Sequence, residues 1–571
     1  MTEDLSLRRR LEALIDGAAR AAMQAGALPD VALPGADLER PKDPANGDYA
    51  SSLPLRLARA AMMPPLQIAE AIAAHLPADD TIQAPAVAAP GFINLRLAER
   101  LMQSEVERII AAGAAFADLT LGQGQRAQVE FVSANPTGPL HVGNGRGAAI
   151  GDTLASVLAA AGYAVEREYY VNDAGTQTEM FAETLYARYQ ELFGREAPIP
   201  AEGYPGDYMI EVAEAVRDRL GDRFLAAEGE PADAALAELG IELMVERIEA
   251  SLTHFGVRYD RWFRERSLFD ASGGDETAPY EAAMAVLREN GHLVEREGAV
   301  WLTSSALGEE KDNVVVRSDG RPTYFASDIA YHYDKFANRG FDLVIDVWGA
   351  DHHGHVSRVK VATEAVAGRG DALHVLLYQL VTLKRGDEVV RLSKRGGEII
   401  TLDELIEEVG PDAARFFFLL RAPSSQMEFD LELAVTQSNE NPVYYIQYAH
   451  ARLASMLDRA AAEGHSPDGG DVTLLTAPHE FALIREMMRL PEVIELVATT
   501  FEPQHLAHYG TELATAFHAF NDAFKQLGDS GLKVLTDDAA LTAARLRLVF
   551  AAKIALSRVL DLMGMSAPER M

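Results

Sequence analysis

The sequence predicts a multidomain α/β protein with a parallel-sheet domain in the middle, a small α+β unit before it and an all-α bundle after it. Its 571 residues are several times the usual length of one domain. A pattern of strand, loop, helix and strand begins at Gln128, which is typical of a parallel α/β sheet. Near residue 435 this alternation gives way to long amphipathic helices, which indicates a helical bundle.

The first unit is expected to span residues 1–115. Helical periodicity covers residues 5–25, 49–62 and 66–75, and a strand-like run follows at 91–97. Residues 111–114 are small and weakly patterned, so we place the boundary there.

The middle unit is expected to span residues 116–435. Its first strand, helix and second strand are predicted at 129–132, 143–161 and 165–171. An acidic, mostly helical insertion from about residue 180 to about residue 310 then interrupts the alternation. Strand-like runs resume at 313–316, 343–347 and 375–383, and we expect one parallel sheet split by the insertion.

The last unit is expected to span residues 436–571. Four amphipathic helices are predicted, at 442–463, 479–500, 503–528 and 538–564. Turn-forming residues separate them, which is typical of a helical bundle.

Composition narrows the classes of function. The chain has no cysteine, which excludes disulfides, thiolate zinc sites and a cysteine nucleophile, so any metal would have oxygen or histidine ligands. Charged residues interrupt the amino-terminal segment and every apolar stretch, so we expect neither a signal peptide nor a membrane span. These features predict a cytoplasmic protein.

The net charge of −34 argues at first against a nucleic-acid partner, because phosphate binding needs Lys and Arg. The charge is unevenly distributed, however. Residues 171–320 hold fourteen Lys and Arg against thirty-one Asp and Glu, which is half of the total excess. The rest of the chain can present locally basic surfaces, so the acidity permits a polyanionic partner without predicting one.

The segment Pro139 to Asn144 joins the first predicted strand of the sheet to a helix. Ligands bind at this edge of open α/β sheets, and amides at a helix N-terminus suit phosphate. Gly143 and Gly145 lack the β-carbons that would hold a nucleotide away, and His141 and Asn144 are predicted to project from one face as two donors. Taken alone, a glycine-rich turn that binds nothing is the commoner case.

A second candidate is the basic loop at residues 391–397, RLSKRGG, after a predicted hairpin that turns at residues 385–387. A helix capped near Thr401 or Asp403 follows. Mobile cations flanked by glycines suit phosphoryl chemistry, because a lysine can follow the charge that builds on departing pyrophosphate. Alone, the loop is equally a solvated basic turn, and its position after the first motif favours the functional interpretation.

The two segments in this order resemble HIGH and KMSKS, the signatures of class I aminoacyl-tRNA synthetases. Within that class the chain resembles the arginyl-tRNA synthetases, and the resemblance covers nearly its whole length. The matching segments are GFINLRL (91–97), EFVSANPTGPLHVGNGRGAAIGD (130–152), YYVNDAGTQ (169–177), PTYFASDIAYHYDKF (322–336), VWGADHHGHVSR (347–358), RLSKRGGEIITLDELIEEVGPDAARFFFL (391–419) and NPVYYIQYAHAR (441–452). It implies a Rossmann-like catalytic domain with a helical insertion, a small N-terminal domain that faces the tRNA elbow and an all-α anticodon-binding bundle.

The resemblance also assigns residues to arginine. Glu130 and Asn135 match the family's arginine-binding positions, as do Tyr324 and Asp328 on a later helix, and His352 falls where the family has another polar contact. A planar guanidinium with five donors is best held by carboxylates with an aromatic or amide group beside them. A neutral analogue would leave a carboxylate unpaired, which explains selectivity without editing. Without the resemblance, Tyr324 and Asp328 would be assigned to an ordinary surface helix.

The resemblance further implies catalytic roles and ATP contacts at the two signatures, and tRNA contacts elsewhere. The second histidine of HIGH is Asn144 here, which donates a hydrogen bond but carries no positive charge, and the first lysine of KMSKS is Arg391. The implied catalytic residues are His141, Asn144, Ser393 and Lys394; the ATP-binding residues are His141, Gly143, Asn144, Arg391, Lys394 and Arg395; the tRNA-binding residues are Phe92, Asn94 and Tyr448. Phe92 is equally interpretable as strand core, and Tyr444, Tyr445 and Tyr448 as helix packing.

The expected function is ATP-dependent ligation of L-arginine to tRNA(Arg) through an arginyl-adenylate, with release of AMP and pyrophosphate. Mg2+ is expected to accompany ATP, without a protein metal cage, and the enzyme is expected to be a monomer. One alternative is a small-molecule nucleotidyltransferase of the same superfamily, which would have no use for the last domain. Another is a noncatalytic tRNA-binding paralogue, which would be expected to lose the polar pocket.

Overall fold

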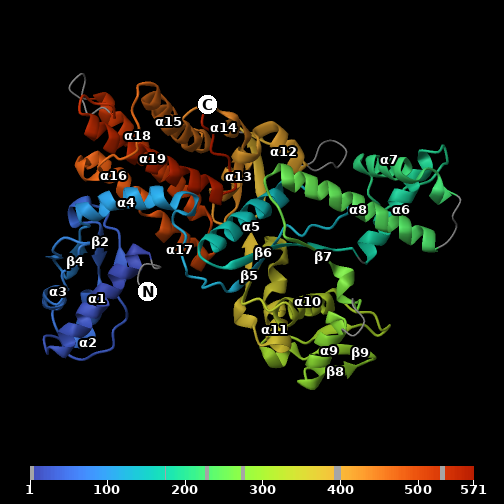
Figure 1. Ribbon diagram of the computed structural model, residues 1–571. Helices are drawn as coiled ribbons and strands as arrows, with labels where there is room; N and C mark the ends of the chain where they lie inside the picture. Colours follow the sequence, from blue (N-terminus) through green and yellow to red (C-terminus); the bar gives the residue numbers. More distant parts are fainter. Residues whose placement is uncertain are drawn as a thin grey trace.

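The computed structural model describes residues 6–173, 175–225, 230–271, 277–386, 388–390, 400–526 and 534–571. The N-terminal domain lies below one end of the helical bundle, and the central sheet lies between the bundle and two further lobes (Figure 1). No helix in these residues is long and apolar enough to cross a membrane.

A small antiparallel sheet organises the N-terminal domain. Its strand order is β1-β2-β4-β3, with bounds β1 (Leu38–Glu39), β2 (Tyr49–Ser51), β3 (Ala86–Ala88) and β4 (Phe92–Leu95). The helices of this domain are α1 (Leu7–Gln24), α2 (Leu53–Ala61) and α3 (Pro65–Ala74). The single helix predicted over 49–62 was wrong at its start. Tyr49 to Ser51 pair with β4 instead, and Pro54 opens α2 in its first turn.

Five parallel strands form the central sheet of the described chain, in the order β12-β11-β5-β6-β7. Their bounds are β5 (Arg126–Phe131), β6 (Ala164–Val171), β7 (Arg261–Arg264), β11 (Leu343–Gly349) and β12 (Leu373–Tyr378). Helix α5 (Val142–Ala160) packs on this sheet, and most of its residues are buried. A β-carbon at Gly151 would lie 2.2 Å from the Phe131 ring, so this glycine lets helix and strand approach closely.

Two predictions about this sheet were wrong. Asn313–Val316 is β10, and it belongs to a separate antiparallel sheet with β8 (Leu293–Arg296) and β9 (Ala299–Leu302). The insertion, in turn, supplies β7 to the parallel sheet, where Trp262 and Phe263 stack on Tyr169 and Tyr170 of β6. Short apolar runs show that a strand forms, but they do not specify which strand it pairs with.

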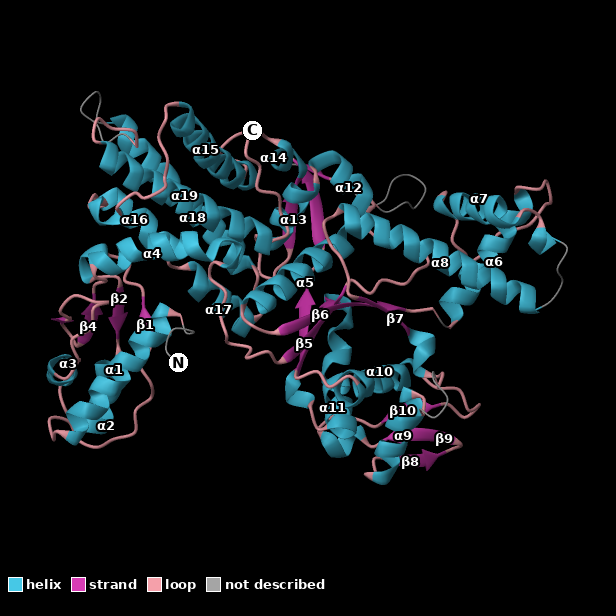
Figure 2. Cartoon of the chain, viewed as in Figure 1, coloured by secondary structure: helices cyan, strands magenta, loops and turns pink. Residues whose placement is uncertain are grey.

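Two lobes flank the central sheet, one of helices and one of helices with a small sheet (Figure 2). The insertion contributes α6 (Thr176–Glu191), α7 (Tyr208–Leu220) and α8 (Glu230–His254), which enclose an apolar core of their own. The second lobe combines the β8 to β10 sheet with α9 (Pro279–Glu289), α10 (Tyr324–Tyr333) and α11 (Val356–Ala367). The buried acids and bases of the candidate site lie where α10 meets the central sheet.

The run 375–383, predicted as one strand, is divided between two sheets. The chain leaves the central sheet after β12 and enters β13 (Val381–Arg385), which pairs with β14 (Glu388–Val389) and β15 (Met427–Asp430). The predicted hairpin is confirmed, because β13 and β14 pair antiparallel. The helices α12 (Leu402–Val409), α13 (Pro411–Leu419) and α14 (Leu431–Val435) complete this region.

The C-terminal bundle comprises α15 (Pro442–Ala462), α16 (Pro478–Met487), α17 (Leu490–Thr500), α18 (Gln504–Gln526) and α19 (Ala539–Leu562). The single helix predicted at 479–500 was wrong, because the chain breaks after Met487 and Pro491 opens a new helix. Helix α4 (Glu99–Ala112) leads from the N-terminal domain and packs on α16 and α19.

One buried side chain connects three of these parts. Arg415 of α13 pairs with Asp152 of α5 and donates to the carbonyl oxygens of Met563, at 2.7 Å, and Phe255, at 3.2 Å. Met563 directly follows α19 of the bundle, and Phe255 directly follows α8 of the insertion. A single guanidinium therefore joins α5, the insertion and the bundle.

Candidate active site

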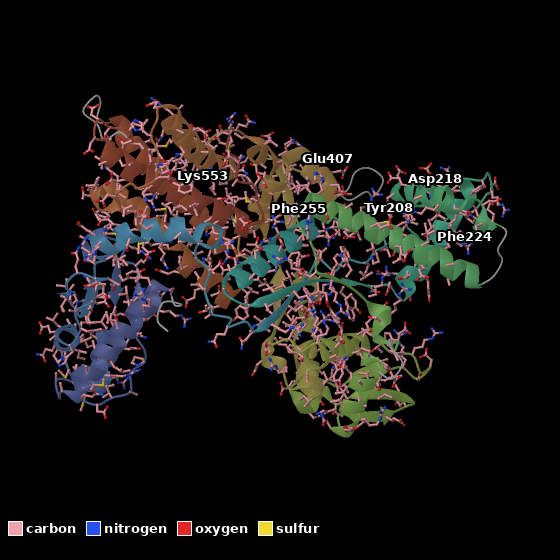
Figure 3. All side chains as sticks on the ribbon, viewed as in Figure 1. Tyr208, Asp218, Phe224, Phe255, Glu407 and Lys553 are labelled. Atoms are coloured by element: carbon pink, nitrogen blue, oxygen red, sulfur yellow. The ribbon has the colours of Figure 1, made fainter. Side chains whose placement is uncertain are left out.

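A cavity of about 930 Å3 opens where β5 ends and α5 begins. Asn135, His141 and Asn144 line one wall, and the opposite wall comes from the insertion and from α12. Figure 3 labels Tyr208 of α7 and Glu407 of α12, two residues that line this cavity. The structure therefore places the predicted HIGH-like segment at a ligand-sized cavity at the carboxyl edge of the sheet.

His141 and Asn144 bind each other rather than projecting in parallel from one face. His141 is the extended residue before α5, and its Nδ1 accepts a hydrogen bond from the Asn144 amide at 3.3 Å. The Asn144 Oδ1 in turn accepts from the His141 amide at 3.0 Å. This capping box leaves His141 Nε2–H and the Asn144 NH2 group as neutral donors. Burial lowers the pKa of His141, although Asp351 opposes the shift, so the imidazole is neutral at pH 7.

The two glycines of this turn have different roles. A β-carbon at Gly143 would lie 2.9 Å from the His141 ring, so this glycine makes room for the cap. The predicted role of Gly145 in nucleotide approach was wrong. A β-carbon there would lie 2.6 Å from Leu402 and 3.1 Å from Phe418, which are protein packing contacts.

The segment after the basic loop is anchored directly to the start of α5. The amide of Leu402 donates to the Leu140 carbonyl oxygen at 2.8 Å, and His141 forms an isolated bridge with Thr401. Thr401 caps α12, as predicted, through a capping box with Glu404. The predicted residues Arg391, Ser393, Lys394 and Arg395 lie outside the described residues. The described chain resumes at Ile400, next to Thr401, which bridges to His141.

Glu130, at the end of β5, is buried among polar groups. One carboxylate oxygen accepts from Lys335 Nζ at 2.7 Å and the other from the Ser133 hydroxyl at 2.9 Å. Val132 and Ser133 both have positive φ, at 67° and 42°, which is a strained backbone for residues other than glycine. That bend directs Ser133 back onto Glu130. Burial raises the pKa of Glu130, and Lys335 opposes the shift.

Asn135 lies in the loop that leads from β5, the strand of Glu130, to the N-terminus of α5. Its side-chain nitrogen donates to Gln177 of α6, and the residue lines the large cavity together with His141. It is exposed, so its amide is accessible to a ligand. The structure thus connects the strand that carries Glu130 to the N-terminus of α5 through a polar loop.

Tyr324 and Asp328 occupy successive turns at the start of α10. Tyr324 is 58% exposed and its hydroxyl lies near Gly175, whereas Asp328 is partly buried. Burial raises the pKa of Asp328, against the opposing fields of His332 and Arg358. Among the described residues, no donor lies within hydrogen-bonding distance of the Asp328 carboxylate. The surface-helix alternative predicted an exposed acid and a half-buried tyrosine. The structure instead shows a partly buried Asp328 and an exposed Tyr324.

His352 stands apart from this group. It lies in the 3-10 turn Ala350–His355 after β11, is exposed, and faces Asp351 at 3.5 Å. None of the described contacts joins it to Glu130 or Asp328, so its predicted role in arginine binding stays a prediction.

Four buried residues near the pocket had no predicted role. Lys335 binds Glu130 and Asp346, and His332 binds Asp346 at 2.9 Å. Burial would raise the pKa of Asp346, but Lys335 and His332 hold it at about 2. The available signal was Asp346 itself, a charge inside the apolar run 343–348.

The fourth residue, Arg146 of α5, is fully buried and holds backbone carbonyl oxygens rather than a carboxylate. It donates to Gln379 at 2.7 Å, Ser425 at 2.9 Å and Ala422 at 3.0 Å. Burial lowers the pKa of Arg146 to about 10. These bonds fix the chain where it enters β13, the strand that leads to the basic loop.

The residues predicted to contact tRNA are at least partly accessible, on β4 of the N-terminal sheet and on α15 of the bundle. On β4, Ile93 and Leu95 point into the core, while Phe92 and Asn94 are half-buried on the other face, so the core interpretation of Phe92 is not supported. Tyr448 is 37% exposed and stacks on Tyr444 and His518. No contact in the structure tests whether these residues bind RNA.

Three protein families match the chain, each over one part. They are the arginyl tRNA synthetase N terminal domain at residues 9–97, the catalytic domain of class I (R) tRNA synthetases at 105–202 and 274–418, and the DALR anticodon binding domain at 446–571.

The chain is similar along its whole length to proteins named arginine–tRNA ligase or arginyl-tRNA synthetase. The arginine–tRNA ligase of Dehalococcoides mccartyi strain CBDB1 is 48% identical and covers 100% of both chains. That of Heliobacterium modesticaldum strain Ice1 is 46% identical over 99% of each chain. The solved arginyl-tRNA synthetase of Thermus thermophilus, 23% identical, has the same fold, with a TM-score of 0.76 over 99% of this chain and 100% of its own.

Proposed function

The chain belongs to the arginyl-tRNA synthetase family of class I synthetases, and from that premise we propose how its residues divide the reaction. It is an arginine–tRNA ligase whose substrates are L-arginine, ATP and tRNA(Arg). The proposal concerns the roles of single residues, the intermediate, the metal and the assembly.

The amino acid is held by its guanidinium group. Asp328 receives the cation, Glu130 lies beside it, Tyr324 covers the entrance, and Asn135 and His352 complete the polar lining. The observation that carries this assignment is the partly buried Asp328 carboxylate, whose pKa burial raises and which has no donor within hydrogen-bonding distance among the described residues. An isolated carboxylate in such a place is costly unless a cation binds it, and arginine supplies one with fixed donor geometry.

ATP is held at the N-terminus of α5. The Gly143 amide, His141 Nε2–H and the Asn144 side-chain NH2 group donate to phosphate oxygens at this terminus. The positive charge comes from the basic loop, where Arg391, Lys394 and Arg395 contact the phosphates and Ser393 takes part in catalysis. The family resemblance supports these loop assignments, together with the contacts that join Thr401 to His141 and Leu402 to Leu140 just after the loop.

The reaction proceeds in two transfers. The carboxylate oxygen of arginine attacks the α-phosphorus of ATP, the bond to pyrophosphate breaks, and arginyl-adenylate forms. A terminal ribose hydroxyl of the tRNA then attacks the activated carbonyl and AMP leaves. The protein contributes mainly position and charge compensation, because both reacting groups are anionic in the first transfer.

Mg2+ enters with ATP in this proposal. The cavity wall carries Asp207, Glu211, Asp403 and Glu407, whose oxygen atoms suit Mg2+, while no three such groups among the described residues come together as a direct ligand set. The phosphate oxygens and water would therefore supply most direct ligands, and the metal would neutralise charge on the departing pyrophosphate.

The flanking domains bind the tRNA. The N-terminal domain, residues 1–115, faces the tRNA elbow through Phe92 and Asn94 of β4. The bundle, residues 436–571, reads the anticodon, with Tyr448 as one stacking surface. We expect a cytoplasmic monomer, and light scattering of the purified protein with and without tRNA checks the assembly.

Arginine-dependent exchange of pyrophosphate into ATP tests the function directly. The exchange is measured with and without tRNA(Arg), and citrulline replaces arginine as the control amino acid. We expect exchange with arginine and a loss of at least about 100-fold with citrulline, because the neutral analogue leaves Asp328 unpaired. A folded sample that shows no exchange in either condition would refute the assignment.

A further inference from the structure

Lys335 contacts Glu130, one of the residues assigned to the proposed guanidinium site. It sits in a single π-helical turn, Asp334–Asn338, that continues α10, and it is completely buried. Its ammonium group lies 2.7 Å from Glu130, 2.8 Å from Asp346 and 4.0 Å from the centre of the Tyr331 ring. Glu130 and Asp346 are neighbours in the sheet, paired across β5 and β11. One cation therefore bridges two carboxylates on adjacent parallel strands.

His332 completes the pairing. Its Nε2 faces the Asp346 carboxylate at 2.9 Å, and its Nδ1 faces the backbone carbonyl oxygen of Asp328 at 2.7 Å. Both neighbours are oxygen atoms, so the imidazole links the Asp346 carboxylate to the backbone of α10. Lys335 and His332 are thus the basic side chains that contact this pair of acids, Lys335 both of them and His332 Asp346.

Other charged groups around the pocket have partners of their own. Glu168, on β6, is bound by Arg339 and by the Tyr331 hydroxyl, and Arg339 also binds Glu166. Arg358, on α11, lies over the Phe325 ring and contacts His355. Among the described residues, no protein cation contacts the Asp328 carboxylate, and the neighbouring Glu265 carboxylate is held by the Ser327 and Tyr170 hydroxyls.

We propose that Lys335 is a positioning residue that sets the charge of the arginine pocket, neutralising Glu130 so that a single carboxylate, Asp328, remains for the substrate guanidinium. This inference rests on the proposed arginine site. It explains why two acids can line a pocket for one cation: a buried net charge of minus two would be strongly unfavourable, whereas minus one is matched by the ligand. Lys335 also holds Glu130 against Ser133, so the pocket is preorganised before arginine enters.

The variant Lys335→Met removes the cation and keeps the volume. Glu130 then faces Asp346, Glu168, Tyr170, Tyr259 and Tyr331 without its ammonium partner. A proton should occupy Glu130 near neutral pH, and arginine binding should become coupled to its release. We expect the KM for arginine to fall about tenfold from about pH 6.5 to about pH 8.5 in this variant, against less than about twofold in the native enzyme. The KM for ATP should stay flat with pH in both.

Arg339→Met is the matched control. It removes a largely buried cation of the same network that binds Glu166 and Glu168 but does not contact Glu130. A purely structural network predicts that both variants lose stability and that neither changes the pH profile for arginine. The proposal predicts the pH-dependent KM in Lys335→Met alone, and the same profile in both variants would overturn it.

A double variant provides the same test if Lys335→Met alone does not fold. Lys335→Met with Asp346→Asn removes one charge of each sign, so fewer charges remain unpaired, yet Glu130 still lacks its cation. The pH-dependent KM for arginine should persist, and a flat profile in this folded protein would overturn the inference. Asp328→Asn separates this result from the proposed function. If it leaves the KM for arginine unchanged, the guanidinium site itself is misplaced; if it raises that KM while the Lys335 variants keep a flat profile, only the role of Lys335 fails.

Discussion

The two halves of the active site handle charge in opposite ways. Around the proposed arginine site, acids and bases are buried and paired at distances of 2.7–2.9 Å, and none of the described cations contacts the partly buried Asp328 carboxylate. Around the nucleotide, the described residues of the α5 N-terminus are neutral donors that hold each other in a capping box. The site for a small fixed cation is thus built from rigid charge, while the site for phosphates that change charge during the reaction relies on amides and a separate basic loop.

The largest effect should come from removing the loop's cation. If the neutral end of α5 depends on charge delivered by the loop, Lys394→Ala should lower the rate of adenylate formation by about 100- to 1,000-fold, with tRNA affinity nearly unchanged. Pre-steady-state formation of arginyl-adenylate measures this. Lys384→Ala is the control, because Lys384 lies on β13 in an ion pair with exposed Glu428. An unchanged rate in Lys394→Ala would mean that α5 supplies enough stabilisation alone.

The next effect tests the charged half. Asp328→Asn keeps the shape of the pocket but removes its unmatched charge, so the KM for arginine should rise about 100-fold, equivalent to about 2.7 kcal/mol, while the KM for ATP stays within about twofold. Steady-state exchange kinetics with each substrate varied give both values. Asp319→Asn, at the exposed turn before α10, should change neither constant. Equal increases in both constants would contradict a specific guanidinium contact.

The smallest effect concerns Asn144, whose side-chain oxygen caps α5 and whose NH2 group is the proposed phosphate donor. Asn144→Ala removes both, so we expect about tenfold slower adenylate formation and a loss of about 1 kcal/mol in the free energy of unfolding. Asn144→Asp keeps an oxygen that accepts from the His141 amide but replaces the donor with an anion. It should fold as stably as the native protein and still be slower than Asn144→Ala. Comparable activity in Asp and native enzymes would show that Asn144 contacts no phosphate.

Sequence reasoning succeeded where a signal is local. The β5 strand, the helix after His141, the cap at Thr401 and the hairpin at β13 all follow from turn chemistry and periodicity within a few residues. It failed where the outcome depends on distant partners. Asn313–Val316 reads like any apolar strand, yet it pairs with β9 rather than joining the parallel sheet, and β7 was hidden in a helical region because four residues carry little periodicity.

By itself the sequence determined the family and the fold class, and it predicted the candidate site residues, because those depend on residue type and spacing along the chain. Only the tertiary structure decided how the charges are shared. Lys335, Glu130 and Asp346 come from three separate segments, and nothing in their spacing shows that parallel pairing of β5 with β11 brings two acids onto one lysine. Among the described residues, the same folding places no cation on Asp328, and in our proposal the energetic cost of that unpaired carboxylate is what makes the pocket select arginine.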